Sequence, residues 1–191
     1  IIEKDDLNKI YDIAFKKDIY IISDEVYSRM VYESNFNFFS VSQIDKCLER
    51  TILINGFSKA FAMTGWRVGV AIAPLNVSEK ITLLSESIVS CVPGFVQDAA
   101  QKALLLSQDE TKLMYNKFRN RQLKLIKEFK KVDGIECLVP EGAMYVFPSI
   151  KSITNDSVKF ALHLLETEGI ACVPGIYFGK SGEGYLRFSC A

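Results

Sequence analysis

The sequence contains almost no histidine. Among its 191 residues there is one, His163, on the polar side of an expected helix with Asp156, Lys159 and Glu166, a setting typical of a solvated side chain. A single histidine with scattered cysteines excludes a zinc site. Ser58 has no His/Asp partner set, which disfavours a serine hydrolase.

The sequence also lacks long runs of one charge or of apolar residues. Its 23 basic residues balance 23 acidic ones. Such a chain has neither the electrostatic footprint of a nucleic-acid-binding protein nor a basic face for membranes, and no stretch approaches the length of a bilayer span. We expect no nucleic acid and no membrane among its partners, and small neutral or zwitterionic ligands instead.

The cysteines do not form a disulfide framework. They are five in number, widely spaced and mostly in apolar surroundings: Cys47, Cys91, Cys137, Cys172 and Cys190. This usage is typical of reduced, packing thiols in a cytoplasmic protein. With 49% hydrophobic residues, the chain is long enough to bury a sizeable core.

The first third of the chain alternates between helix and strand. The pattern predicts a helix up to about Lys17 and strands over 19–22, 51–54 and 68–72. Short β-branched runs of this kind suit strands covered on both faces. In open α/β sheets the ligand lies at the carboxyl ends of the strands. Asp24 follows the first strand and Lys59 the second, so we expect them at one site.

Helical periodicity then takes over, and a second domain follows. We expect a helix from about Val77, with Asn76 or Ser78 as its N-cap and an end at 91–94. The later elements are predicted as helices over 95–106, 110–131 and 156–168 and strands over 135–139, 145–148, 170–173 and 185–189. The sequence therefore predicts an α/β part over 1–75, connecting helices over 76–109 and a small α+β domain over 110–191.

Lys59 is the most informative residue. It follows an apolar strand and lies between Ser58 and Ala60, with aromatic residues on either side. Such neighbours are unusual for a lysine on a solvent-exposed surface. An amine held this way, with Arg67 nearby, suits an aldehyde cofactor that carries a phosphate. An ordinary surface lysine is the alternative.

The segment 56–69, GFSKAFAMTGWRVG, resembles the pyridoxal-phosphate lysine signature of the class I/II aminotransferases, of fold type I and similar to aspartate aminotransferase. Four further segments resemble the same family: SDEVY at 23–27, PEGAMY at 140–145, VPG at 173–175 and GYLRFS at 184–189. The matches cover nearly the whole chain in the family's order, which makes them far more specific than a lone motif.

The resemblance implies a role for each matched residue that faces the cofactor. Lys59 would form the Schiff base with pyridoxal 5'-phosphate and then move a proton at the substrate α-carbon. Asp24 would face the pyridine nitrogen, and Tyr27 would bond the phenolate oxygen. Taken alone, Asp24 is also compatible with a helix cap and Tyr27 with an ordinary half-buried tyrosine.

The same resemblance implies two anion-binding sites. Arg67 would bind the cofactor phosphate, with Ser58 nearby, although Gly56 stands where some members have a phosphate-binding serine. Arg187 would bind the substrate α-carboxylate. A structural salt bridge of Arg187 with Glu141 or Glu183 is the alternative.

We therefore expect a fragment of an aminotransferase that exchanges an amino group between an L-amino acid, aspartate among the candidates, and a 2-oxo acid. Family members are about twice this length, and we expect the phosphate loop and a ring-stacking aromatic outside this chain. The alternatives are a lyase or synthase with the same cofactor, and a catalytically inactive domain. The parent is expected to be a homodimer, with the fragment exposing apolar surface around the helix near Val77.

Overall fold

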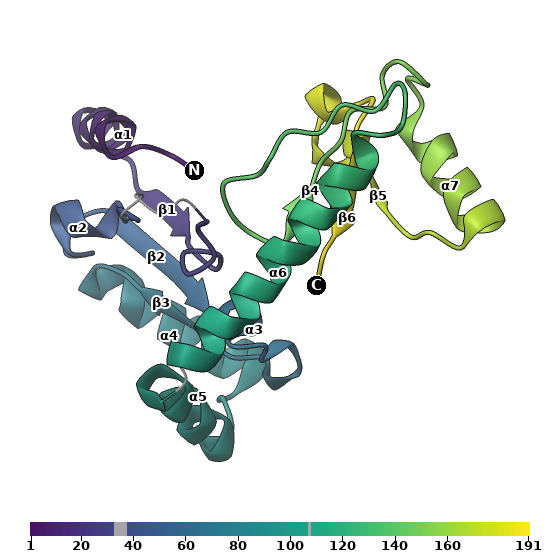
Figure 1. Cartoon of the computed structure of the whole chain (residues 1–191). Coiled ribbons are helices and arrows are strands. Elements are labelled where there is room, and N and C mark those ends of the chain that lie inside the picture. The colour runs from purple at the N-terminus through teal and green to yellow at the C-terminus, as the bar shows by residue number, and fades with distance from the viewer. Residues whose placement is uncertain (33–37, 107) are drawn as a thin grey trace. The chain divides into compact units, whose positions relative to one another are not determined.

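The computed structural model describes residues 1–32, 38–106 and 108–191. These form two compact units, 1–112 and 113–191 (Figure 1). We refer to them as the first and the second unit and describe each by itself. The fold is a mixed α/β one, as predicted, while the assignment of 1–75, 76–109 and 110–191 to named domains stays a prediction. Within the described ranges, no helix is both long and apolar enough to cross a membrane.

The first unit is built on a three-stranded sheet. Helix α1 (Lys4–Lys17) leads into β1 (Ile21–Asp24), followed by β2 (Thr51–Gly56) and β3 (Gly69–Ile72). The strand order is β1–β2–β3. β1 runs parallel to β2, whereas β3 is antiparallel to it. The sheet therefore brings the end of β1, the end of β2 and the start of β3 to one edge.

The first strand lies two residues later than the sequence pattern predicts. Ile19 lies just after α1 and is still bonded to it, because its N–H donates to the carbonyl oxygen of Ala14 at 3.0 Å. Pairing begins only where the Ile21 N–H donates to the Arg50 carbonyl, also at 3.0 Å. Asp24 is consequently the last residue of the strand rather than the residue after it.

The expectation that both faces of the sheet are covered is wrong for the described residues. All four positions of β3 are exposed, and β1 alternates between half-buried and exposed residues. Ile22, Val70 and Ile72 are large apolar side chains that remain exposed. The apolar pattern that predicted strands is therefore present, but no layer of described residues covers it.

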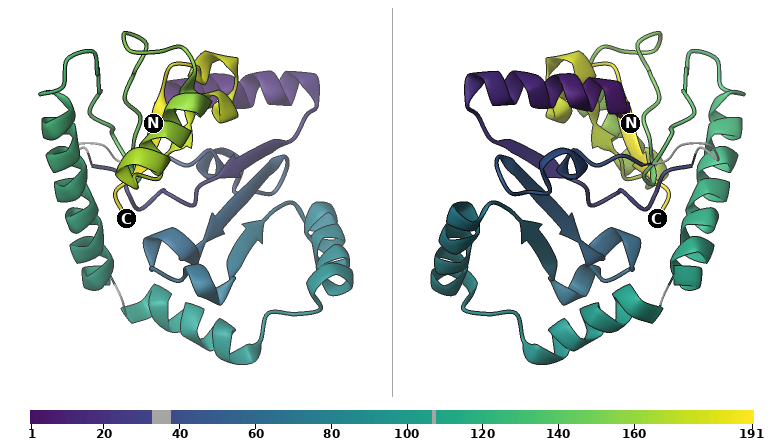
Figure 2. Two further views of the ribbon diagram at one scale, coloured as in Figure 1. Left: turned by 90° about the vertical axis from the view of Figure 1, so that its right-hand side faces the viewer. Right: turned by 90° about the vertical axis from the view of Figure 1, so that its left-hand side faces the viewer.

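Two longer helices complete the first unit, α4 (Leu75–Val89) and α5 (Gly94–Leu106). Figure 2 shows α4 as a separate rod at the side of the sheet, and none of its residues is buried. The predicted N-caps Asn76 and Ser78 are wrong. Pro74 occupies the N-cap, and its carbonyl accepts from the backbone N–H groups of Val77 and Ser78 at 2.9 Å.

The second unit has a small antiparallel sheet. Its strands are β4 (Tyr145–Val146), β5 (Val173–Pro174) and β6 (Leu186–Ser189), in the order β4–β6–β5. Helix α6 (Gln108–Phe129) begins before the boundary between the units, and α7 (Ser157–Glu168) is capped by Asp156, whose carboxylate accepts from the Lys159 N–H at 2.9 Å.

The strand predicted over 135–139 does not form. Only Glu136 pairs there, in an isolated antiparallel bridge with Ser149. The backbones of Glu136 and Ser149 exchange two hydrogen bonds, at 3.2 and 2.7 Å, and the described residues 137–139 do not continue this pairing. The strands predicted over 145–148 and 185–189 are confirmed but are shorter than expected, whereas the strand predicted over 170–173 begins only at Val173 and ends at Pro174.

Two buried clusters close the second unit. The first joins α6 to the sheet through Ile126, Val146 and Cys190. The second joins α7 to the sheet and contains Ile150, Ala161 and Leu186. Phe188 packs against both clusters, so alternate residues of β6 point into the core. Arg187, between Leu186 and Phe188, consequently belongs to the opposite face of the sheet.

Candidate active site

Lys59 lies on a four-residue helix, α3 (Phe57–Ala60), that directly follows β2. Phe57 and Ala60 are buried, and Lys59 is half-buried between them. Phe57 packs with Met63 and with Ala100 of α5. These contacts fix the helix on its apolar side. The structure thus places Lys59 three residues past the end of β2, on a helix rather than at the strand terminus itself.

Asp24 ends β1 at the same edge. It pairs in register with Ile54 of β2, and the N–H of the next residue, Glu25, donates to the Ile54 carbonyl at 2.8 Å. The Asp24 side chain is exposed, and its Oδ1 accepts from the Val26 N–H at 3.2 Å. No helix follows, so the helix-cap alternative is wrong. The carboxylate instead stabilises a tight turn.

Tyr27 belongs to this turn and is half-buried. The turn is held against the end of β2, because Asn55 Nδ2 donates to Ser28 Oγ at 3.4 Å. A side chain at Gly56 would contact Val26 at 3.6 Å, which shows how closely the turn approaches the residue before α3. Asp24, Tyr27 and Lys59 are therefore carried by neighbouring segments at one edge of the sheet.

Arg67 lies at the same edge, just before β3. The register opposes Gly56 to Gly69, so Arg67 is two residues outside the β2–β3 pair, on the side where α3 begins. It ends the short 3₁₀ helix Thr64–Trp66 in a left-handed conformation, with φ of 51°. Its Nη1 donates to the Thr64 carbonyl at 2.9 Å, and the side chain is exposed. The guanidinium therefore keeps most of its five N–H donors for an anion.

Ser58 is half-buried on α3, next to Lys59. The backbone N–H of Phe57 donates to the Val68 carbonyl at 3.4 Å, which links the start of α3 to the segment that carries Arg67. Ser58 and Arg67 thus come from two chain segments that are hydrogen-bonded to each other. Their predicted shared role at a phosphate stays a prediction.

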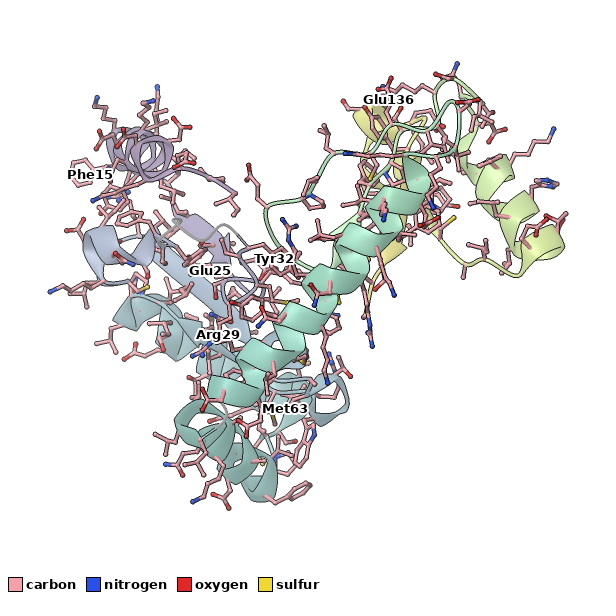
Figure 3. All side chains as sticks on the ribbon, in the orientation of Figure 1. Phe15, Glu25, Arg29, Tyr32, Met63 and Glu136 are labelled. Atoms are coloured by element: carbon pink, nitrogen blue, oxygen red, sulfur yellow. The ribbon has the colours of Figure 1, made fainter. Side chains whose placement is uncertain are left out.

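The sequence reasoning missed Glu25, which braces the turn after Asp24. Its Oε1 accepts from Ser23 Oγ at 2.9 Å and from Ser40 Oγ at 2.6 Å. Figure 3 shows Glu25 just past the end of β1. Ser40 is buried and also bonds Ser42, 2.7 Å away between hydroxyl oxygens. The sequence signal, a second acid after the strand, does not reveal a partner fifteen residues away.

Arg187 belongs to the second unit, where β6 pairs it with Val173 of β5. Its guanidinium carbon lies 4.4 Å from the ring centre of Tyr145 and 4.8 Å from that of Phe178. Glu183, one of the two acids considered as an ion-pair partner, accepts from the backbone N–H groups of Ser157 at 2.7 Å and Gly184 at 3.0 Å. These two bonds hold the pKa of Glu183 below its usual value.

The structure thus gathers five of the six predicted residues in the first unit: Asp24, Tyr27, Ser58, Lys59 and Arg67. All five lie at or just beyond the edge where β1 and β2 end and β3 begins. The sixth, Arg187, is placed within the second unit. An amine, a carboxylate, a phenol, a hydroxyl and a guanidinium on neighbouring segments form a set that can hold a phosphorylated aromatic aldehyde.

Comparison with known proteins identifies the family of the chain. The family model for aminotransferase class I and II matches residues 1–191. The chain is 39% identical over 196 residues to an aspartate aminotransferase of Pyrococcus abyssi, covering 100% of this chain and 49% of that protein. It is also 39% identical over 196 residues to aromatic-amino-acid aminotransferase 2 of Thermococcus litoralis, with the same coverage of 100% and 49%.

A solved structure extends the comparison to the fold. The crystal structure of an aromatic aminotransferase from Pyrococcus horikoshii matches with a TM-score of 0.92 at 38% identity, over 100% of this chain and 51% of that one. The chain spans about half the length of the curated relatives it matches. The fold described above is therefore a partial one.

Proposed function

Because the chain belongs to the class I and II aminotransferase family, we propose that it carries the lysine-bearing part of an enzyme that moves an amino group between an L-amino acid and a 2-oxo acid. The observation that supports this most is the position of Lys59. It is half-buried on a helix fixed by Phe57, at the sheet edge where Asp24 ends β1.

The family generally depends on pyridoxal phosphate, and the donor set fits this cofactor. Arg67 keeps N–H donors free for a phosphate, with Ser58 on the adjoining segment. Among the described residues Oδ1 of Asp24 accepts from the Val26 N–H, and Oδ2 would accept from a ring N–H. Tyr27 would donate its phenol O–H to the ring oxygen. When bound, the cofactor supplies an aldehyde that reacts with amines and a ring that withdraws electrons.

Each of three side chains would have a separate role in the reaction. The Lys59 amine would first hold the cofactor and, once displaced by the substrate amine, would take the proton from the substrate α-carbon and release it to the carbon that carried the cofactor's aldehyde. Asp24 would keep a proton on the ring nitrogen through its negative charge. Arg187 would fix the substrate through its carboxylate. One lysine thus serves both attachment and proton transfer.

The rest of the proposal concerns substrate, assembly and location. We propose an L-amino acid substrate, with aspartate and aromatic amino acids as the first to test, since relatives bear these names. The parent would be a homodimer, and the exposed apolar residues of α4 favour an interface there. All five cysteines are free thiols, which favours a cytoplasmic location.

Two alternatives remain beside this reading. A lyase or synthase would use the same lysine, aspartate, tyrosine and arginine, so product analysis of a full-length parent separates it from a transaminase. An inactive isolated domain is the other. It is favoured by one observation, the exposed apolar surface of the sheet at Ile22, Val70 and Ile72.

Reductive trapping tests the proposal. The purified chain is incubated with pyridoxal phosphate and borohydride, and the modified lysine is located by peptide mass spectrometry alongside the visible spectrum. We expect modification concentrated on Lys59 and lost in Lys59→Ala. Lys80→Ala, which removes an exposed lysine of α4, is the matched control and should leave the labelling unchanged. Labelling spread evenly over exposed lysines, or unchanged in Lys59→Ala, contradicts a cofactor site in this chain.

A further inference from the structure

Two aromatic rings, those of Tyr145 and Phe178, lie against the guanidinium of Arg187, and neither residue has been given a function above. Tyr145 lies on β4 and Phe178 follows β5, and β6 with Arg187 lies between these two strands. The two rings therefore approach the guanidinium from opposite flanks of β6, at 4.4 and 4.8 Å from its central carbon. A guanidinium attracts ring faces, and rings on its flanks leave its N–H edge open.

Phe178, which is 51% exposed, makes a second ring contact. Its ring meets Phe147 edge to face with centres 5.8 Å apart, and Phe147 stacks on Tyr185 at 5.1 Å. The result is a continuous aromatic layer on the face of the small sheet opposite its core. A side chain that contacts such a layer loses rotational freedom before any ligand arrives.

The backbone around Phe178 is also locked. Phe178 ends the 3₁₀ helix Gly175–Phe178, whose first residue touches the carbonyl of Gly182 so closely that a Cβ at either position would collide with backbone atoms. The Gly175 N–H also donates to the Tyr185 carbonyl at 2.8 Å. The turn that carries Phe178 is thereby tied to the residues just before Arg187.

Apart from the backbone pairing of β6 with β5, the described residues 113–191 offer the guanidinium of Arg187 no hydrogen bond or ion pair. Glu183 is engaged by two backbone N–H groups, as described above. The guanidinium is thus positioned by rings, which orient it without consuming its N–H donors. This is the arrangement expected for a cation that binds an exchangeable anion rather than a permanent structural partner.

We propose that Phe178 and Tyr145 are positioning residues that clamp the guanidinium of Arg187 in one orientation, ready to form two parallel hydrogen bonds with a substrate carboxylate. This inference rests on the proposed function, in which Arg187 binds that carboxylate. Neither ring needs to touch the reacting atoms. Their contribution is to pre-orient the fork, which lowers the conformational entropy lost on binding.

The test uses the complete 191-residue chain and succinate as the carboxylate probe. The Nε–Hε signal of Arg187 is assigned by Arg187→Lys and followed by NMR during titration, with sodium chloride of equal ionic strength as the blank. Phe178→Leu keeps a side chain of similar size but removes the ring face, Phe178→Tyr keeps the face, and Tyr145→Leu tests the other ring. Tyr177→Ala is the control, because Tyr177 is the neighbouring aromatic and is 68% exposed.

We expect a saturable shift in the wild type, in Phe178→Tyr and in Tyr177→Ala. In Phe178→Leu and Tyr145→Leu the dissociation constant should rise about threefold to tenfold, with faster rotation of the guanidinium, as loss of a cation–π contact predicts. Equal affinity in wild type and both leucine variants overturns the clamp, and so does an Arg187 signal indifferent to succinate. Reductive trapping at Lys59 depends on neither ring. A failure of the proposed function would therefore appear as lost trapping, whereas a failure of the clamp would appear only as unchanged succinate binding in the leucine variants.

Discussion

The first and the second unit differ in how their buried apolar side chains are grouped. The second unit has two buried clusters joined through Phe188, and its longest helix faces the sheet. Among the described residues of the first unit, one cluster of Phe57, Met63 and Ala100 supports α3, other buried side chains such as Met30 and Val41 lie outside this cluster, and β3 and α4 contain no buried residue. The difference teaches that burial in the first unit is local and leaves α4 and part of the sheet exposed, whereas in the second unit it is continuous from α6 through the sheet to α7. We expect the exposed elements of the first unit to contribute little to stability and to respond more to ligands.

The largest expected effect comes from replacing an isoleucine by alanine at one position in each unit. Ile150 in the second unit is 1% exposed, and Ile22 in the first unit is 72% exposed. Ile150→Ala should reduce the free energy of unfolding by about 2–5 kcal/mol because it leaves a cavity. Ile22→Ala should change it by less than about 0.5 kcal/mol. Urea unfolding followed by circular dichroism measures both, and similar losses in the two variants would contradict the contrast.

Acid should act on both units through one carboxylate in each. In the first unit, burial tends to raise the pKa of Asp45, but backbone N–H groups of Arg50, Thr51 and Cys47, each at 3.0 Å, lower it, and the net shift is downward. In the second unit, backbone bonds lower the pKa of Glu183. A carboxylate with a lowered folded-state pKa stabilises the fold above its unfolded pKa, and this contribution is lost as the pH falls through the folded value.

The ordinary pKa values of these groups are 3.8 and 4.5, so the loss of stability should begin below them. Asp45→Asn should remove the pH-dependent contribution of this carboxylate to the stability of the first unit. Glu183→Gln should do the same in the second unit. Hydrogen exchange and melting temperature between about pH 2 and 6 resolve the two. Wild-type stability that rises as the pH falls through this range would show that the sign of both shifts is wrong.

The smallest expected effect concerns α4. Ile88 on this helix is 76% exposed, and its neighbours Leu84 and Val89 are exposed as well. The predicted exposure of apolar surface around this helix is confirmed, whereas association of the chain stays a prediction. Ile88→Lys should weaken self-association in sedimentation experiments without changing the melting temperature. Leu138→Lys, at an 88% exposed position of the second unit, is the control. Association that is equally strong in both variants would place the interface elsewhere.

Several elements could be predicted because their signals are local. The spacing of Leu7, Ile10, Tyr11 and Ala14 predicted α1, which ends at Lys17 as expected. The break at 91–94 between α4 and α5 was equally clear, since Pro93 and Gly94 interrupt the helical pattern. The fourteen residues around Lys59 identified the family, which the match over residues 1–191 confirms.

Other features could not be predicted because they depend on distant partners. The start of β1 at Ile21 is set by the Arg50 carbonyl, twenty-nine residues further along the chain, and not by the apolar run that begins at Ile19. The strand expected over 135–139 is reduced to one bridge between Glu136 and Ser149, thirteen residues apart, which the local apolar pattern does not indicate. Glu25 is bound by Ser40, and nothing in the spacing of the two residues indicates this bond.

The sequence by itself determined the family, the helices and the residue types at the candidate site, because helical periodicity and a contiguous motif are properties of neighbours along the chain. The tertiary structure alone decided which edge gathers Asp24, Lys59 and Arg67, since strand pairing and register join residues far apart in sequence. It also decided that rings rather than acids surround Arg187 in the second unit. A cation on a strand requires stabilising contacts, and only the fold determines which neighbours provide them.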